Sequence, residues 1–534
     1  MDSRVTLPSR PQPISPSAKQ VEPHSCWVPD RVTLLFLLAA LTFLYSLLFV
    51  PPFIPIDHNV DGLTHVIDAM RMHEGEAMYR DFFQFVTPGS PLVFFFLFKL
   101  FGLRLWIPDL TILLLGLGLA WLGVAIAKKV MRPSLALLPS ALFLAGVYKC
   151  DLDCTHHWFS LLTAVAAIAA LMERRTPARI AAAGFFCGLT LCFTQSNGLA
   201  VAAGIGAFLW WESRRRQEGW RKLLKKEAWL VAPFLATLFA VNAYFIWKAG
   251  LPRFLWCTVV FGVKYWPKET YVNTFWPDLV QDLPGFGTLR LFLEGSLQWL
   301  FVYVVIPFTY VLFFARYRRD SGKKPAEYWA RPMLLAIVGS FMLLSIIPAP
   351  SLFRMLLSEL PGVILLGWLI DSPGKLARAV GGALALGVLL VPPHAALVAQ
   401  SMPKQILSTP QGRAAFTNRV YYQECVWIQQ HTRPLEYFRA AFADVYFYLN
   451  LRNPTPLPYI TNTGYTTVEQ VAEVIRGVEL HRPRYIAWSP SDVDDYSWRD
   501  PSDDHLGPLR NYLLTHYRLV KVFKEYDEIW ERKD

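Results

Sequence analysis

Charged residues are scarce in this chain: Asp, Glu, Lys and Arg make up 17% of its 534 residues, against 54% hydrophobic residues. The apolar residues are gathered into long runs and the mean hydropathy is +0.30, which excludes an ordinary soluble protein and indicates a membrane protein. The net charge of +11 lies in short clusters between these runs, where membrane topology places Lys and Arg. Nucleic acid is therefore not an expected partner.

Cysteine is also rare. Most of the seven cysteines lie inside or beside apolar runs, where buried packing is their usual role. Cys150 and Cys154 flank Asp151 and Asp153, which leaves a local disulfide or a share in a metal site open. A four-residue spacing without a second pair is a weak metal signal, so a structural role is favoured.

The first residues lack an apolar leader. We expect 1–30, which contain six prolines, to form a disordered cytoplasmic tail. No plausible cleavage site follows the first long apolar run, so that run is expected to be a retained membrane helix.

Eleven apolar segments approach the length of about 20 residues that a membrane crossing needs. They are 32–50, 106–127, 133–149, 157–172, 180–195, 197–212, 228–247, 297–315, 333–347, 356–370 and 377–396. Basic loops alternate with loops poor in Lys and Arg along this series, and the positive-inside rule makes the basic loops cytoplasmic. The N-terminus is then inside and the C-terminal region outside.

The expected fold class is a mainly α polytopic membrane protein with about 11 transmembrane helices and a small α/β domain at the C-terminal end. The transmembrane domain would cover 31–396, with outer loops at 51–105 and 248–296, and 91–102 would lie in the outer interface because it is too short to cross. Residues 397–534 would form the outer domain. In it, Thr466–Glu469 matches a capping box, and PRYIAWSP and YRLVKVF resemble strands.

An acid-rich segment, 57–83, directly follows the first apolar run. Carboxylates beside a bilayer are costly to desolvate, so several of them next to a membrane helix suggest a role at the membrane surface. Asp57 and Asp61 are four residues apart and would share one face of a helix. Asp68, Glu74 and Glu76 are interpreted as solvated surface residues.

Charge alternation brings several such groups to one side of the membrane. They are Asp57, Asp61, His65, Tyr79 and Arg80 in the first loop, Asp151, Asp153, His156 and His157 in the second, Lys264 in the 248–296 loop, and Arg354 in the PAPSLFR segment. A carboxylate can remove a proton from an acceptor hydroxyl while Lys or Arg holds a phosphate leaving group. The bland alternatives are that the histidines cap or pack a helix start and that a lone arginine contacts lipid head groups.

The order of the motifs adds a family resemblance. A first helix is followed by an outer loop with an acidic residue, Asp61, then by Gly75, YRDFF, Pro-Gly and an apolar stretch ending in FG. This order resembles the integral-membrane C-type glycosyltransferases (GT-C), in the branch of protein mannosyltransferases and aminoarabinose lipid A transferases. The resemblance covers about 30–396, and the C-terminal region is similar to outer domains of bacterial members.

The resemblance implies an enzyme of the bacterial inner membrane that transfers a sugar, with inversion, from a polyprenyl-phosphate-linked donor to an acceptor glycan, lipid or protein on the outer face. Asp61, with Asp57 as the second candidate, would be catalytic, and Arg354 with Lys264 would bind the carrier phosphate. The residues left to position donor or acceptor are Asp151, Asp153, His65, His157, Tyr79 and Arg80. Many members have Asp-Glu where this chain has Asp61-Gly62, and His65 or Asp57 could compensate.

No cofactor is required if these cations stabilise the leaving phosphate, although Asp153, His156 and His157 could bind a divalent metal. No glycine-rich nucleotide loop is apparent, in line with a lipid-linked donor. A transporter is the main alternative, but transporters tend to place ionisable residues at mid-membrane in repeated halves, and no repeat is visible here. A non-catalytic membrane scaffold with an outer ligand-binding domain is the third hypothesis.

Overall fold

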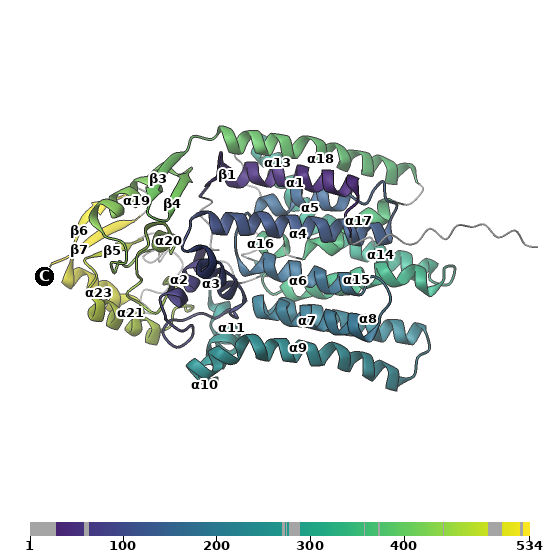
Figure 1. The fold of residues 1–534 in the computed structure, drawn as a ribbon, viewed down its shortest axis with the longest axis horizontal. Helices are drawn as coiled ribbons and strands as arrows, with labels where there is room; N and C mark the ends of the chain where they lie inside the picture. Colours follow the sequence, from purple (N-terminus) through teal and green to yellow (C-terminus); the bar gives the residue numbers. More distant parts are fainter. Residues whose placement is uncertain are drawn as a thin grey trace, which may run out of the picture.

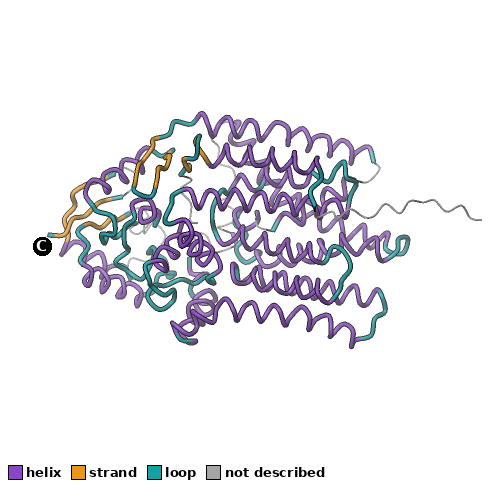
Figure 2. Tube along the Cα trace, viewed as in Figure 1, coloured by secondary structure: helices purple, strands orange, loops and turns teal. Residues whose placement is uncertain are grey.

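A long bundle of helices makes up most of the molecule, and a smaller mixed region covers one end of it (Figure 1). The structure, a computed structural model, describes residues 28–57, 63–269, 273, 275–276, 289–356, 358–371, 374–441, 443–489, 505–523 and 527–533. Most of the expected tail at 1–30, and Asp61, lie outside these residues. Among the described residues, strands occur only at the covered end of the bundle (Figure 2).

Each of the eleven apolar segments falls on a helix of the bundle. The helices are α1 (Arg31–Leu48), α4 (Trp106–Val130), α5 (Leu138–Gly146), α6 (His156–Ala170), α7 (Pro177–Phe193), α8 (Gln195–Arg215), α9 (Trp220–Ala249), α13 and α14 (Leu289–Leu300 and Ile306–Asp320, joined by a π turn, Phe301–Val305), α15 (Ala326–Ile346), α17 (Glu359–Ile370) and α18 (Lys375–Ser401). The hydrophobic pattern therefore predicts these elements well.

Six helical segments among the described residues are long and apolar enough to cross a membrane, which makes the chain an integral membrane protein. They are Arg31–Leu48, Trp106–Val130, Trp220–Ala249, Gly295–Asp320, Ala326–Ile346 and Ala379–Ser401. Five further apolar segments are shorter, including α6, α7 and α17. The count of about 11 spans stays a prediction.

Small residues allow the helices to pack closely. At Gly184 in α7, a Cβ atom would lie 2.1 Å from the carbonyl oxygen of Leu230 in α9, so only glycine permits this approach. Large side chains fill the wider spaces, and Trp158 in α6 and Trp329 in α15 are both fully buried. The bundle is thus held by close packing, which is the main source of helix association in a lipid environment.

The basic loops meet at one end of the bundle, where they surround a pocket of about 950 Å³. Their cations pair with carboxylates from neighbouring loops: Lys129 Nζ lies 2.7 Å from Glu173 Oε1, and Arg175 Nε lies 3.6 Å from Glu212 Oε1. The loops that alternate in the sequence therefore lie at two physical ends. Which end faces the cytoplasm stays a prediction.

The opposite end carries short elements and the C-terminal region (Figure 1). The short elements are β1 (Phe49–Val50), β2 (Ile54–Pro55), α2 (Leu63–His73), α3 (Gly89–Phe101), α10 (Leu251–Leu255), α11 (Gly262–Lys264) and α16 (Leu352–Leu356), with single turns at Tyr148–Cys150, Trp256–Phe261 and Trp266–Lys268. The C-terminal elements are β3 (Gln405–Thr409), β4 (Gly412–Phe416), α19 (Arg419–His431), α20 (Asp444–Leu449), α21 (Val468–His481), β5 (Tyr485–Trp488), α23 (Gly507–His516), β6 (Tyr517–Val522) and β7 (Glu528–Arg532).

The C-terminal strands form a hairpin, β3–β4, and an antiparallel sheet in the order β5-β7-β6. Both expected strands are present, PRYIAWSP as β5 and YRLVKVF as β6. The capping box lies one residue further on than expected, because Thr467 and Gln470 make the reciprocal side-chain and backbone bonds at the start of α21.

The C-terminal region is held to the loop between α1 and α4 by several polar contacts. Tyr448 donates a hydrogen bond of 2.7 Å to Asp57 Oδ1, and Arg452 Nε lies 2.8 Å from Glu74 Oε2. The rings of Phe98 in α3 and Phe447 in α20 are stacked. The two parts therefore share one core, and the space left between them is the candidate site.

Candidate functional site

A cavity of about 1370 Å³ lies between the end of the helical bundle and the C-terminal region. Its walls come from α2, the starts of α6 and α8, the segments 258–273 and 345–354, and the C-terminal region. A concave space of this size, with apolar walls and a few converging polar groups, is the usual form of a ligand site. Of the residues singled out from the sequence, it brings together His65, His156, His157 and Arg354.

Two histidines, the buried His65 and the half-buried His156, form a pair in the wall of this cavity. His65 Nε2 in α2 lies 2.9 Å from His156 Nδ1 at the start of α6. Burial lowers the pKa of His65 to about 4, because desolvation disfavours its charged form. His65 is therefore neutral near pH 7, and in such a pair one ring donates the hydrogen bond and the other accepts it.

Asp68 lies behind this pair, also in α2. Its Oδ2 is 3.9 Å from His65 Nδ1 and accepts a hydrogen bond of 2.7 Å from Gln84 Nε2. Burial raises the pKa of Asp68 to about 7, and the bond from Gln84 opposes this rise. The expectation that Asp68 is solvated is wrong: α2 packs against α3 and α20, and only 2% of Asp68 is exposed.

Arg354 reaches the cavity from the short helix α16. Its guanidinium lies over the ring of Trp266, 4.8 Å from the centroid, and donates a 2.6 Å hydrogen bond to Asn273 Oδ1. A second bond of 3.2 Å goes to the carbonyl of Ala349. Stacking on an aromatic ring fixes the plane of a guanidinium, and a fixed plane suits two-point recognition of phosphate or carboxylate oxygens.

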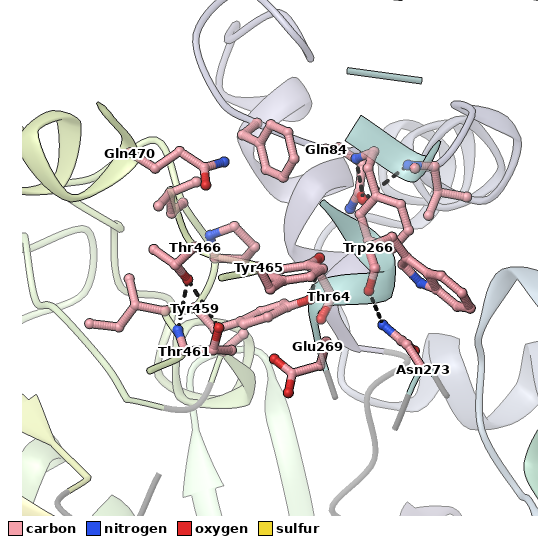
Figure 3. A pocket seen from close by; sticks show the side chains of 18 of the residues that line it. Thr64, Gln84, Trp266, Glu269, Asn273, Tyr459, Thr461, Tyr465, Thr466 and Gln470 are labelled. Carbon is pink, nitrogen blue, oxygen red and sulfur yellow. Dashed lines mark hydrogen bonds between the residues drawn. The ribbon is translucent and has the colours of Figure 1, made fainter. Parts of the chain in front are cut away.

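A short segment that begins at Trp266 links Arg354 to the C-terminal region. Asn273 bonds to Arg354 at one end, and its backbone N–H donates to the carbonyl of Glu269. Glu269, which is 8% exposed, accepts a 2.6 Å hydrogen bond from Thr463. Figure 3 shows Glu269 between the tyrosines of the C-terminal region and the Trp266 side of the cavity.

Other residues singled out from the sequence lie away from the cavity lining. Asp57 is 5% exposed and faces Tyr448. Tyr79 is buried and donates to the carbonyl of Val86, and Arg80 is a surface residue paired with Asp81. Their contacts shape the first loop.

Asp151, Asp153 and Lys264 lie close in the sequence to lining residues, Thr155 and Val263, without lining the cavity themselves. Asp151 and Asp153 precede the first turn of α6, and the Asp151 carbonyl accepts a hydrogen bond from Trp158 Nε1. Lys264 lies over the ring of Tyr265, with its Nζ 5.2 Å from the centroid. Asp61, the principal candidate, lies outside the described residues and immediately before α2.

The described residues contain no group of three or more His, Cys, Asp or Glu arranged to hold a metal ion. The rings of His156 and His157 are in contact, with centroids 3.8 Å apart and 36° between their planes, and His157 also packs edge-on to Phe353. Cys150 and Cys154 are free thiols. His156 and His157 thus pack against aromatic rings, and His156 also bonds to His65.

Sequence reasoning missed Gln84, Glu269 and Asn273. Gln84 and Asn273 are amides and Glu269 is an isolated acid. All three lie in loops, and none belongs to a sequence motif. Their importance comes from partners far along the chain, as with Asn273 and Arg354, which are 81 residues apart. A clue was available in the aromatic surroundings of 264–268, where Trp and Tyr accompany isolated cations.

No family model and no curated protein matches the sequence. The structure of ArnT from Cupriavidus metallidurans bound to undecaprenyl phosphate is similar over 93% of this chain and 97% of that chain, with a TM-score of 0.55 and 14% identity. AglB from Archaeoglobus fulgidus in complex with an inhibitory peptide and a dolichol-phosphate matches 85% of this chain and 69% of that one (TM-score 0.47, 11% identity). Arabinofuranosyltransferase AftD from Mycobacteria matches 95% of this chain and 40% of that one (TM-score 0.48, 12% identity).

The ArnT likeness extends over nearly the whole of both chains, so it includes the helical bundle and the C-terminal region together. At 14% identity it concerns the arrangement of the backbone. The chain has the fold of the C-type glycosyltransferases, the fold that the order of its motifs predicts.

Proposed function

We propose that this protein is a membrane glycosyltransferase, which moves a sugar from a polyprenyl-phosphate-linked donor to an acceptor glycan, lipid or protein on the outer face of the membrane. The observation that carries the proposal is the cavity at the end of the apolar bundle, with Arg354 fixed on Trp266 in its wall. Support comes from the fold shared with ArnT, whose structure contains undecaprenyl phosphate.

The reaction follows from these groups. An acceptor hydroxyl attacks the anomeric carbon of the donor sugar, and the bond between that carbon and the phosphate oxygen breaks. The phosphate leaves with the bonding electrons, and the charge of Arg354 stabilises it. Asp61 takes the hydroxyl proton as general base. A single displacement of this kind inverts the anomeric carbon.

The other candidate residues take supporting roles in this proposal. His65 lines the cavity and, with Asp151, Asp153 and His157, would position donor or acceptor. Asp57, which accepts a hydrogen bond from Tyr448, would hold the first loop against the C-terminal region and so fix the position of the base. Lys264 would meet the carrier lipid near the cavity mouth.

The topology belongs to the same proposal. We expect about 11 spans over 31–396, a cytoplasmic tail at 1–30 and an outer domain at 397–534. The basic end of the bundle would then face the cytoplasm and the cavity would face outward, in a bacterial inner membrane. A cysteine-accessibility scan should place 214–226 inside and residue 450 outside, and finding both on one side would contradict this orientation.

Reconstitution tests the reaction. The full chain in proteoliposomes would be given undecaprenyl-phosphate-linked sugars carrying a radiolabel, together with a cell-envelope extract as the acceptor source. We expect the label to pass from the lipid to an acceptor, with free undecaprenyl phosphate released. A protein that binds no such donor and releases no carrier phosphate would contradict the proposal, and net movement of intact donor across the membrane would favour a transporter.

A further inference from the structure

The outer wall of the cavity differs in chemistry from the part that faces the membrane bundle. The described C-terminal residues that line it are mostly aromatic, hydroxyl-bearing, amide or aliphatic, and two of them, Arg439 and Asp444, are charged. Arg439 is buried and donates to the carbonyl of Ala440. Phosphate groups and charged peptides bind where several opposite charges converge, and this wall does not offer such a cluster among its described residues.

Two tyrosines form a flat surface on this wall. The rings of Tyr459 and Tyr465 are stacked, with centroids 5.9 Å apart and 15° between their planes, and their hydroxyls lie 2.8 Å apart. Tyr465 is buried and packs edge-on against Phe261 and Phe85. Tyr459 is the more exposed of the two, so Tyr465 acts as a fixed support for its ring.

Hydroxyl groups edge this aromatic surface. Thr461 Oγ1 lies 3.0 Å from Thr463 Oγ1 and 3.2 Å from Thr466 Oγ1, and the Thr461 backbone N–H donates to Thr466 Oγ1. Figure 3 shows Thr461 and Thr466 beside the tyrosine pair. The network orients these hydroxyls before any ligand arrives, which reduces the entropy lost on binding.

We propose that this wall is the acceptor subsite and that its ligand is a neutral carbohydrate chain. Calling it an acceptor subsite rests on the proposed function. A sugar ring has faces of C–H groups, which pack on the electron-rich face of an aromatic ring, and hydroxyls that both donate and accept hydrogen bonds. A lipid tail could not use the donor and acceptor capacity that remains on these threonine hydroxyls beyond their bonds to one another.

The same cavity holds the proposed phosphate group of the donor. Glu269 bonds to Thr463 beside the tyrosines, and Asn273, which donates its backbone N–H to Glu269, bonds to Arg354. A glycan on Tyr459 and a carrier phosphate on Arg354 would therefore occupy one space at the same time. Transfer between two bound substrates requires this arrangement.

Direct binding tests the subsite without relying on transfer. Purified full-length protein in lipid nanodiscs would be titrated with neutral hexasaccharides of glucose, mannose, galactose and N-acetylglucosamine by calorimetry. We expect at least one to bind, about tenfold more weakly to Tyr459→Leu, and within about twofold of wild type to Tyr459→Phe, because an aromatic contact is worth about a factor of ten. Tyr437→Leu is the matched control, since Tyr437 also stacks, on His481, but does not line the cavity.

Each outcome bears on the proposal in a defined way. Binding of no hexasaccharide to wild type, or equal binding to wild type and Tyr459→Leu, would overturn it. Equal loss in Tyr459→Leu and Tyr437→Leu would also do so, because the effect would then be a general weakening of the C-terminal region. Glycan binding without any binding of undecaprenyl phosphate would sink the proposed function and leave the carbohydrate site standing. The reverse result would sink the carbohydrate site alone.

Discussion

The basic end of the bundle and the surroundings of the cavity at the other end hold their charged groups in different ways. At the basic end, carboxylates pair with cations, as Glu173 does with Lys129 and Arg179. At the cavity end, Asp68 and Arg354 have amide side chains, Gln84 and Asn273, as hydrogen-bond partners. The pair of Glu173 and Lys129 neutralises two charges, whereas the amide of Asn273 orients the Arg354 guanidinium in the cavity wall. The difference suggests that one end secures the fold and the other binds ligand.

The largest expected effect breaks the chemistry at the cavity end. Asp61→Asn keeps the size of the side chain and removes its basic site, so turnover should fall by about 10²- to 10⁴-fold, the usual contribution of a positioned base. Donor binding should stay nearly unchanged. Turnover is measured as sugar transfer by the reconstituted variant, and donor binding is measured by calorimetry.

Asp57→Asn is the comparison for this variant and should be milder, because Asp57 faces Tyr448. Normal transfer by Asp61→Asn together with a large loss in Asp57→Asn would reverse the two roles. If neither variant loses activity, the assignment of an enzyme is itself in doubt.

Arg354→Ala should weaken donor binding by about 10- to 100-fold, since a hydrogen bond to a charged group contributes about 1.5–3 kcal/mol. Arg354→Lys should restore part of the affinity, because a point charge replaces a planar fork. Arg253→Ala is a matched control: Arg253 also lies over a tryptophan, Trp256, and it does not line the cavity. Unchanged donor affinity in Arg354→Ala would remove Arg354 from the site.

Asp68→Asn should change how stability depends on pH. In the wild type, the raised pKa of Asp68, about 7, makes the free energy of unfolding fall as pH rises from about 4 to 7. The lowered pKa of His65, about 4, makes it rise between about 4 and 6.5, so the two effects oppose each other. Removing the Asp68 contribution should make the variant gain stability relative to wild type across this range, on the order of 4 kcal/mol, since each of about three pH units contributes about 1.4 kcal/mol.

Thermal unfolding in detergent between pH 4.5 and 7.5 measures this difference. Asp81→Asn is the control, because hydrogen bonds from Arg80 hold the pKa of Asp81 below its usual range. Its contribution is therefore lost only at more acidic pH, and this variant should run parallel to wild type. A parallel curve for Asp68→Asn would mean that Asp68 does not hold a proton in the folded protein.

The smallest effect is expected at the basic end. Glu173→Gln removes a carboxylate that pairs with Lys129 and Arg179, and it should cost about 1 kcal/mol of stability, as partly exposed pairs do. Transfer kinetics should not change. A clear loss of donor affinity in this variant would contradict the assignment of ligand binding to the cavity end alone.

The sequence predicts the helices and strands because their hydrophobic patterns are local. Where two patterns overlap, it cannot choose between them: both Thr466–Glu469 and Thr467–Gln470 match a capping box, and the helix begins at the second. Alternation of basic loops also separates the two ends correctly, since each crossing moves the chain from one end to the other.

The detail of the site could not be predicted in the same way. Asp68 is expected at the surface because carboxylates are usually solvated, yet α2 packs against α3 and α20 and only 2% of Asp68 is exposed. Asn273 and Glu269 have no motif, and their roles depend on bonds to Arg354 and Thr463 that only the tertiary structure creates. Side-chain partners from distant segments are what local patterns leave out.

The link between Arg354 and Thr463 has a thermodynamic consequence for the two proposed ligands. Because Asn273 and Glu269 join the phosphate side of the cavity to the threonine network, a ligand that shifts one side changes the free energy of the other. Any such coupling is reciprocal: if carrier phosphate strengthens glycan binding by some factor, glycan strengthens carrier binding by the same factor. Substrate order would then be a property of this short segment, and the affinity of each ligand would report on the presence of the other.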